Sequence, residues 1–377
     1  MSDHLKYYKN IKSIPTLNLG DLNIRVLFKQ RENFYFNLGI TKQNFYKKSI
    51  LELCSGTGYN AYFLNKFFKV KRIKLVDNNP ESIKTSRKNL SKFKKIKIVN
   101  KNIKNFTSSE KFDYVIIENA LDNFSNEKKI IYKLINLTSK KGNIILTIGD
   151  NFGIFSTKLR YVFSLILIEQ SEFKNFNDKL IFLSKVFKPH LSYLSKNTRN
   201  EKKWVLDNIL NHNWIKKKEY INYPKLIKFI KNRAIIQNVS PSFFKNFNWY
   251  KNFDLKNINN MYLDFYKKEK LNFLDFETKF ENDINIDINI RNISNLIFNL
   301  KTGEKINKKI IKQIEREIKK INFKLSKLKK NNKISLALNE FGKLLKQFIL
   351  NKKIKSETKH FKKLWGVYNQ NVLLYKI

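Results

Sequence analysis

The sequence lacks the residues that commonly cross-link small folds. Cys54 is the only cysteine among 377 residues, so an internal disulfide is impossible and a cysteine-rich zinc site is excluded. The four histidines, at positions 4, 190, 212 and 360, include no pair with the i, i+4 spacing of a helical metal site. We therefore predict no metal site.

Long apolar runs are also missing. The best stretch, 162–168, is interrupted by Ser164 and stops at Glu169, short of the ~20 apolar residues that a membrane helix needs. The first residues, MSDHLKYYKN, contain neither the apolar region nor the small-residue cleavage site of a secretory signal. We therefore expect no membrane span and a cytoplasmic location. The sequence does not indicate an oligomeric state.

Acidic residues are few, with 31 Asp and Glu against 76 Lys and Arg, which gives a net charge of +45. Such a balance ordinarily favours nucleic-acid binding. Here Lys, Asn, Ile and Phe are abundant together, as in KFKKIKIVNKNIKNF, and all four have A/T-rich codons, so genome composition is an alternative source of the lysines. The basic residues are also spread along the whole chain. We favour a solvated lysine-rich surface and keep a nucleic-acid partner as the alternative.

From residue 49 onward, short β-branched runs alternate with helical stretches, a pattern typical of a parallel sheet built from βα units. The predicted strands are 49–53, 73–76, 95–99, 112–117 and 142–148. Helices are predicted after the first strand, from Pro80, and over 126–137. Five repeats in about a hundred residues predict an α/β, Rossmann-like doubly wound sheet, because a barrel needs eight.

Helical periodicity dominates after Asp150, over 157–169, 180–194 and 204–210, and predicts a helical cap over the ligand edge of the sheet. A sixth strand is predicted at 233–239 and a last one at 371–375. If these two strands pair, the end of the chain completes the sheet, and the residues between them form a large helical C-terminal insertion.

The predicted organisation has five parts. They are an N-terminal helical or irregular extension (1–48), a nucleotide-binding core (49–155), a helical cap with the sixth strand (156–250), a helical insertion (251–365) and the closing strand (366–377). The longest helix candidate, 305–330, carries an apolar stripe for which intramolecular packing is favoured over a coiled coil.

The informative residues lie just after each strand, because open α/β sheets bind ligands at the carboxyl ends of their strands. The first strand runs into LELCSGTG, where Gly56 and Gly58 permit a tight turn and a close approach of the backbone to a ligand. Asp77 ends the second strand, nineteen residues after Gly58, where its carboxylate could accept both hydroxyls of a ribose. A helix N-cap is the alternative for Asp77, since it precedes Pro80 closely.

Four segments, LELCSGTG, KLVDNNPESIKTSRKNL, FDYVIIENALDNF and KKGNIILTIGD, resemble successive motifs of class I S-adenosylmethionine-dependent methyltransferases. The resemblance covers about residues 49 to 150. A nicotinamide dehydrogenase would need GxGxxG, whereas Ala61 stands at the third glycine position. The methyltransferase pattern fits better and implies S-adenosylmethionine as the cofactor.

The resemblance also implies a cofactor site. Its residues would be Glu52, Cys54, Gly56, Gly58, Asn60, Asp77, Asn78, Asn102 and Glu118. Those at 52–60 would surround the amino-acid end of the cofactor, Asp77 would hold the ribose, and Asn78 would lie beside the adenine. Many family members have an acid where this chain has Asn102, although an amide oxygen could accept the same hydrogen bond from the adenine amine. Glu118 and Asn119 would lie where the methyl group meets its acceptor.

A hydroxyl acceptor needs a base, and position in the chain suggests several. Glu118, Asp150 and Asp207 are the predicted catalytic residues; Asp122 and His190 are further candidates. For His190 we favour a packed or surface histidine.

One helical stretch, 198–208, concentrates Arg199, Trp204 and Asn208, which we predict to contact the acceptor. Stacking on Trp204 would suit a sugar, while core packing of the same ring is an equal alternative.

Two motifs of nucleic-acid base methylation are absent. The fourth strand is followed by Glu118-Asn119-Ala120-Leu121 rather than Asn/Asp-Pro-Pro-Tyr/Phe, and the chain has no Pro-Cys nucleophile. The segment 77–80, DNNP, is similar to some RNA methyltransferases. We therefore predict methyl transfer to an oxygen or nitrogen of a small-molecule or glycan-linked acceptor. An RNA methyltransferase and a non-catalytic binding protein of the same fold are the alternatives.

Overall fold

The computed structural model describes residues 7–8, 10–11, 24–173, 175–194, 200–243, 257–280, 285–301, 305–327 and 333–377. These residues form two compact units. The first comprises the described parts of 1–149, 221–267 and 369–377, and the second those of 150–220 and 268–368. The predicted acceptor residue Arg199 lies outside the described residues.

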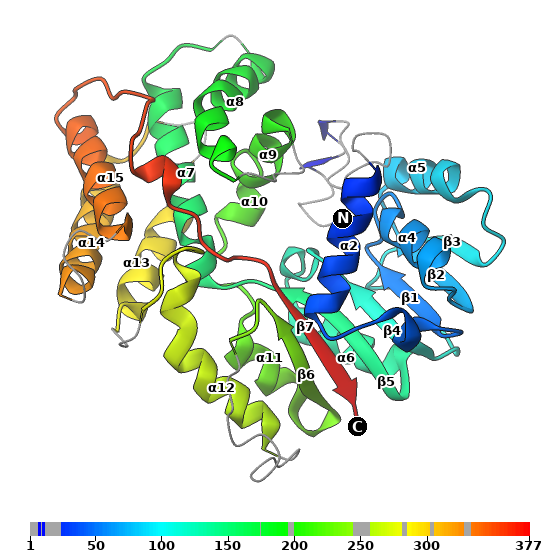
Figure 1. The fold of residues 1–377 in the computed structure, drawn as a ribbon. Helices are drawn as coiled ribbons and strands as arrows, with labels where there is room; N and C mark the ends of the chain where they lie inside the picture. The colour runs from blue at the N-terminus through cyan, green and yellow to red at the C-terminus, as the bar shows by residue number, and fades with distance from the viewer. Residues whose placement is uncertain are drawn as a thin grey trace. The chain divides into compact units, whose positions relative to one another are not determined.

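A seven-stranded sheet forms the centre of the first unit (Figure 1). Its strands are β1 (Ser49–Leu53), β2 (Arg72–Asp77), β3 (Ile96–Asn100), β4 (Phe112–Ile117), β5 (Thr138–Ile148), β6 (Ala234–Ser240) and β7 (Gln370–Lys376). The strand order is β3-β2-β1-β4-β5-β7-β6, and β7 runs antiparallel to both β5 and β6. The predicted fold class is confirmed.

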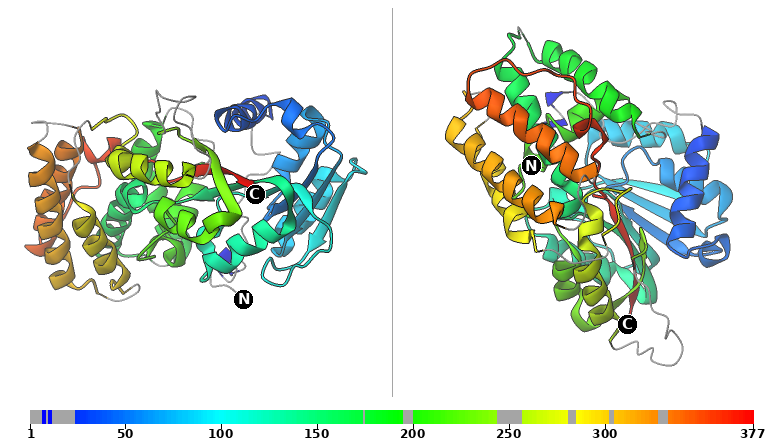
Figure 2. Two further views of the ribbon diagram at one scale, coloured as in Figure 1. Left: turned by 90° about the horizontal axis from the view of Figure 1, so that it is seen from below. Right: turned by 60° about the vertical axis from the view of Figure 1, so that its left-hand side comes forward.

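The chain's last strand closes the sheet, as the pairing of two distant apolar runs predicts. In Figure 2 the red C-terminal strand lies beside the green β6 in both views, and Tyr375 of β7 pairs with Ile235 of β6 and Asn143 of β5. The long excursion between β6 and β7 is therefore inserted into a sheet that the end of the chain completes.

The order of strands places a switch point between β1 and β4. The chain moves outward from β1 to β2 and β3, then returns to pair β4 with the other side of β1. The carboxyl ends of β1 and β4 flank this switch point, which is where doubly wound sheets bind ligands.

Helices of the first unit pack on this sheet. They are α2 (Ile24–Asn37), α3 (Lys42–Phe45), α4 (Tyr59–Phe67), α5 (Pro80–Leu90), α6 (Glu127–Leu137), α11 (Tyr223–Ile230) and α12 (Ile258–Glu269), with 3-10 turns η2 (Leu121–Asn123) and η3 (Lys231–Arg233). Tyr35, Phe45 and Phe63 from α2, α3 and α4 share one buried cluster with Ile50 and Ile116 of the sheet. α2 thus belongs to the core of this unit.

Asparagine side chains begin many of these helices. Asn79 caps α5, Asn126 caps α6 and Asn222 caps α11, each accepting hydrogen bonds from backbone amides of the first turn. Several of the abundant asparagines therefore serve as helix N-caps.

Most boundaries differ from the predicted ones by a few residues, and two of these differences have a clear local cause. β5 begins at Thr138 rather than 142, because the Lys141-Gly142 turn signal marks an irregularity inside the strand: Lys141 has φ 58° and the pairing with β4 shifts register. α7 (Asn151–Glu169) begins six residues before 157, because Asp150 accepts a hydrogen bond from the Phe152 amide and starts the helix there.

The second unit is helical. Besides α7 it contains α8 (Phe176–Ser192), α9 (Glu201–Asn208), α10 (His212–Ile215), α13 (Asp287–Phe298), α14 (Lys308–Ser326) and α15 (Lys333–Ile349), with η4 (Lys270–Phe273) and η5 (Phe361–Lys363). The apolar stripe of α14 is buried, and α14 packs against α13 and α15. Intramolecular packing therefore accounts for the stripe.

Among the helices of the described ranges, α7 alone has the length and hydropathy of a membrane-crossing helix. Of its most apolar window, 83% is buried inside the protein, as is usual for a core helix. This is weak evidence for a span.

Candidate functional site

The loop between β1 and α4 has a backbone that few residues tolerate. Cys54, Gly56 and Gly58 all adopt left-handed conformations, with φ of 55°, 55° and 73°. Glycine is favoured at position 58 by its left-handed φ, and a Cβ there would lie 2.6 Å from Leu90 Cδ1, so the Leu90 side chain would have to move. Burial, followed by the charge of Asp77, raises the pKa of the Cys54 thiol, which keeps it protonated.

Asp77 ties the ends of β1 and β2 together. Its Oδ2 accepts a hydrogen bond from the Gly56 amide at 2.9 Å, and its Oδ1 accepts one from the Asn79 amide at 2.8 Å. Burial raises the pKa of Asp77, partly offset by these backbone hydrogen bonds. The cap of α5 is Asn79 and not Asp77, so capping does not explain this carboxylate. Each Asp77 oxygen retains lone pairs for a further donor.

Two buried side chains, Glu52 at the end of β1 and Asn60 at the start of α4, each have a polar atom without a well-aligned hydrogen bond. Within the part of the chain that the structure describes, neither Glu52 Oε2 nor Asn60 Nδ2 takes part in a well-aligned hydrogen bond, although the two residues are only 6% and 1% exposed and lie close enough for the Asn60 side chain to lower the pKa of Glu52. An unsatisfied acceptor and an unsatisfied donor are costly in a folded interior. Side by side, they fit a ligand that carries both an ammonium and a carboxylate group, such as the amino-acid end of a cofactor.

Burial raises the pKa of Glu52 to about 8, and the charge of Glu118 adds to this effect. Arg31 and the Asn60 side chain lower the pKa, and Asp77 raises it slightly. Glu52, Asn60, Asp77 and Glu118 therefore belong to one electrostatic cluster, which we call the donor cluster.

Arg31 of α2 donates hydrogen bonds to two residues of the donor cluster, Glu118 and Asn60. Its Nη1 and Nη2 donate to the two carboxylate oxygens of Glu118 at 2.7 and 2.6 Å, while Nη2 also donates to Asn60 Oδ1 at 2.7 Å. Tyr35 donates its hydroxyl hydrogen to the same Asn60 oxygen at 2.8 Å. Burial lowers the pKa of Arg31, but the interactions with Glu118, Tyr35 and Tyr59 together outweigh this effect, so the pKa of Arg31 lies above its ordinary value. A bidentate pair of this kind fixes the orientation of the Glu118 carboxylate and also compensates its charge.

Arg31 and Tyr35 are not recognisable as site residues from a sequence motif. Their only signal is their four-residue spacing with Leu27, which places all three on the buried face of α2. An arginine on the apolar face of a helix is a sign of a distant carboxylate partner.

The remaining predicted residues of the first unit lie at the same strand ends. Asn102 follows β3, and its side-chain oxygen accepts a hydrogen bond from the Lys104 amide at 2.9 Å. Asn119 follows β4 in a left-handed conformation with φ 51°. Asn78 is half-buried. Asp122 is buried, and its Oδ1 accepts a hydrogen bond from the Ile221 amide at 3.2 Å.

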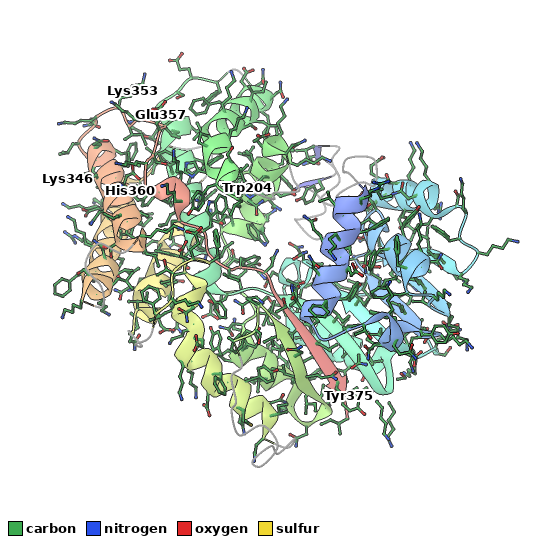
Figure 3. The ribbon with its side chains drawn as sticks, viewed as in Figure 1. Trp204, Lys346, Lys353, Glu357, His360 and Tyr375 are labelled. Carbon is green, nitrogen blue, oxygen red and sulfur yellow. The ribbon has the colours of Figure 1, made fainter. Side chains whose placement is uncertain are left out.

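Asp150, Trp204, Asp207 and Asn208 belong to the second unit. Trp204, labelled on α9 in Figure 3, is 7% exposed and contacts the rings of Phe187 and Trp365 edge-on. This is the core packing that the sequence left open as an alternative to sugar stacking. Asn208 donates to the Trp204 carbonyl at 3.0 Å.

His190 is a packed histidine of the second unit. Its Nδ1 lies 3.2 Å from Arg160 Nε, and its Nε2 lies 3.3 Å from the Thr358 hydroxyl. Burial, followed by the charges of Arg160 and Lys362, lowers the pKa of His190 well below its usual range. The interpretation that we favoured for it agrees with this placement.

The class of protein follows from this geometry. A Rossmann-like sheet closed by an antiparallel β7, a glycine turn after β1 and an acid after β2 define a nucleotide-cofactor-binding α/β domain. Residues 45–220, just under half of the 377-residue chain, match the family described as "Methyltransferase domain". This segment is a class I methyltransferase domain, a family whose cofactor is S-adenosylmethionine.

Several solved structures share part of this fold. The N-methyltransferase NodS of Bradyrhizobium japonicum WM9, in complex with S-adenosyl-L-homocysteine, is 15% identical, covers 38% of this chain and 74% of its own, and gives a TM-score of 0.31. A methyltransferase of Clostridium acetobutylicum ATCC 824 is 20% identical, with coverage of 39% and 56% and a TM-score of 0.30.

Coclaurine N-methyltransferase, bound to N-methylheliamine and S-adenosyl-L-homocysteine, covers 92% of this chain and 72% of its own at 11% identity and a TM-score of 0.38. At these TM-scores the likenesses say nothing about the acceptor. No curated protein sequence matches the chain.

Proposed function

We propose that this chain transfers a methyl group from S-adenosylmethionine to an oxygen or nitrogen of a small-molecule or glycan-linked acceptor. The observation that supports it best is a pair of buried polar atoms beside the glycine turn, Glu52 Oε2 and Asn60 Nδ2, which have no well-aligned hydrogen bond. In this proposal Glu52 accepts from the ammonium of the cofactor and Asn60 donates to its carboxylate.

The other cofactor contacts follow from the strand ends. Gly56 and Gly58 let the backbone approach the ligand, and Asp77, held by two backbone amides, accepts the ribose hydroxyls. Asn78 and Asn102, after β2 and β3, are proposed to lie along the adenine. When bound, the cofactor supplies an electrophilic methyl group on a sulfonium.

The chain's own task is to position the acceptor and to remove its proton. Glu118, Asp150 and Asp207 are the proposed proton acceptors. Both Glu118 oxygens are held by Arg31, and Asp150 Oδ1 caps α7, so taking a proton at either one competes with a contact of the folded protein. Asp207 is half-buried on α9.

Transfer of a labelled methyl group to cellular fractions tests the acceptor. Incubation of the full chain with methyl-labelled S-adenosylmethionine should label extracted metabolite or glycan fractions, and Asp77→Ala should abolish the label. Labelling of RNA instead would overturn the acceptor class. Cofactor binding with no labelled fraction would favour a non-catalytic protein.

The binding of S-adenosylhomocysteine should depend on pH through Glu52. Because the pKa of Glu52 is about 8 without a ligand, the group is mostly protonated at pH 7, and an ammonium against it favours the carboxylate. We therefore expect proton release on binding at pH 7, and an affinity that rises by up to about tenfold per unit between pH 6.5 and 8. Calorimetry in buffers of different ionisation enthalpy measures both.

Glu52→Gln is the matched variant, since it cannot release that proton. Binding that releases as many protons in the variant as in the wild type would contradict the assignment. The unliganded protein offers a second readout. Folding raises the pKa of the Glu52 carboxyl from 4.5 to about 8. Its contribution to the stability of the folded protein is therefore complete below pH 4.5 and is lost as the pH rises to about 8. Glu52→Gln should therefore gain Tm relative to the wild type most clearly at pH 9.

A further inference from the structure

A groove of about 940 Å³ lies at the amino ends of β1, β2 and β3. Three loops form it, each leading into one of these adjacent strands, together with one residue of α4. Its lining residues are Tyr46, Lys47, Asn65, Lys69, Val70, Lys71, Lys92, Phe93, Lys94 and Lys95. We call it the lysine groove.

The lysine groove is more basic than the composition of the chain explains. Six of its ten lining residues are lysines, whereas 76 of the 377 residues of the chain are Lys or Arg. No acidic residue is among those ten. Glu110 pairs with Lys74 and lies 3.8 Å from Arg72, without lining the groove. Genome-wide enrichment in lysine would raise the background and would not gather lysines without acids around one concavity.

The loops of the lysine groove are fixed by backbone contacts. The Lys47 amide donates to the Lys69 carbonyl at 3.3 Å, and the Lys71 amide donates to the Lys48 carbonyl at 2.9 Å. Lys47 and Lys69 have φ of 54° and 48°, a conformation uncommon for residues with side chains. All six lysines are exposed. Their charges therefore converge on the groove before any ligand arrives.

Aromatic rings lie among these charges. Tyr46 is 43% exposed, with Lys47 Nζ 5.2 Å from the centre of its ring. Phe93 is half-buried and packs edge-on against Tyr62. An exposed ring beside several lysines is the combination by which proteins hold unpaired bases and their phosphates together.

We propose that the lysine groove binds a single strand of nucleic acid, with phosphates on the lysines and a base stacked on Tyr46. A flat membrane surface cannot enter a concavity, and a single phosphate would use only a fraction of six cations. The groove lies at the end of the strands opposite to the donor cluster, a separation of about 17 Å for five-residue β1. It is thus an anchoring site distinct from the methyl-donor site, and it does not depend on the proposed acceptor.

Fluorescence anisotropy of the full chain with labelled 15-nucleotide single-stranded RNA and DNA, over a range of salt, tests the proposal. The groove variant is Lys71→Gln/Lys92→Gln/Lys94→Gln. Single-strand binding loses about 0.7 in log–log salt slope per lost phosphate contact, so this variant should lose about 2 in slope and at least about tenfold in affinity. Tyr46→Ala should bind at least about fivefold more weakly, and Tyr46→Phe like the wild type.

The matched control removes the same charge elsewhere in the first unit. Lys84, Lys128 and Lys129 are exposed helical lysines that do not line the groove, and their triple change to Gln should leave affinity within about twofold. An equal loss of affinity in both triple variants would mean that binding depends only on the net charge of the protein, and would overturn the proposal. Loss in the groove variant with no effect of Tyr46→Ala would overturn the assignment to nucleic acid. Unchanged titration of S-adenosylhomocysteine shows that each variant is folded.

Discussion

Asp77→Ala is expected to weaken the binding of S-adenosylhomocysteine by at least about 100-fold. In the proposed site the carboxylate accepts two ribose hydroxyls, and hydrogen bonds to a charged group contribute about 1.5–3 kcal/mol each. The same carboxylate holds the Gly56 and Asn79 amides, so its loss also loosens the glycine turn. Isothermal titration calorimetry measures the affinity, and Asp77→Asn, which keeps one oxygen acceptor, should lie between alanine and the wild type.

Asp113→Ala is the matched control for Asp77→Ala. Asp113, at the start of β4, also accepts two hydrogen bonds in the sheet, from the Ser49 amide at 2.8 Å and the Ser49 hydroxyl at 2.7 Å. Because it lies at the opposite end of the strands, its loss should cost stability and leave affinity unchanged. Equal affinity of Asp77→Ala and the wild type would remove Asp77 from the site.

The strand ends could be predicted from the sequence because their chemistry is local. β1 and β4 have the predicted bounds, since each is a continuous apolar run ended by a polar residue. Gly58 is recognisable because a tight turn at φ 73° favours glycine. The role of Asp77 was left between ribose contact and helix cap, and only the position of Asn79 separates the two.

Contacts across long stretches of sequence could not be predicted. Arg31 and Glu118 are 87 residues apart, and nothing near either residue in the sequence specifies the other. The lysine groove could not be predicted from the sequence for a different reason. Its lysines come from three loops in a chain rich in lysine everywhere, so only the fold shows that they surround one concavity.

Helix boundaries and side-chain burial in the second unit could not be predicted reliably, because polar residues there cap helices or share a helical face with buried rings. The position of Asp150 after β5 suggests a base, while its Oδ1 caps α7 in the structure. Asp207 and Asn208 follow Trp204 on one helical face, which suggests sugar stacking. The Trp204 ring is instead buried against Phe187 and Trp365. Periodicity alone does not distinguish an exposed face from one that a distant helix covers.

Arg31→Met is expected to destabilise the protein by about 3–5 kcal/mol and to lower Tm by several degrees. The variant leaves Glu118, whose side chain is 12% exposed, without the cation that binds both its oxygens, and uncompensated buried charge is strongly destabilising. Arg31→Lys keeps the charge and loses the two-pronged geometry, so it should recover only part of the loss. Thermal and denaturant unfolding measure both variants.

Two further variants separate the loss of the ion pair from the loss of a long side chain. In Arg31→Met/Glu118→Gln no charge is left unpaired, so the double variant should be more stable than Arg31→Met alone, and the cycle of four proteins gives the coupling. Lys29→Met removes a cation from the same helix, where its pair with Glu32 is exposed, with side chains 71% and 47% accessible. Solvent screening makes that pair weak, so Tm should not change. Equal Tm changes for Arg31→Met and Lys29→Met would mean that α2 contributes to the donor cluster only by packing.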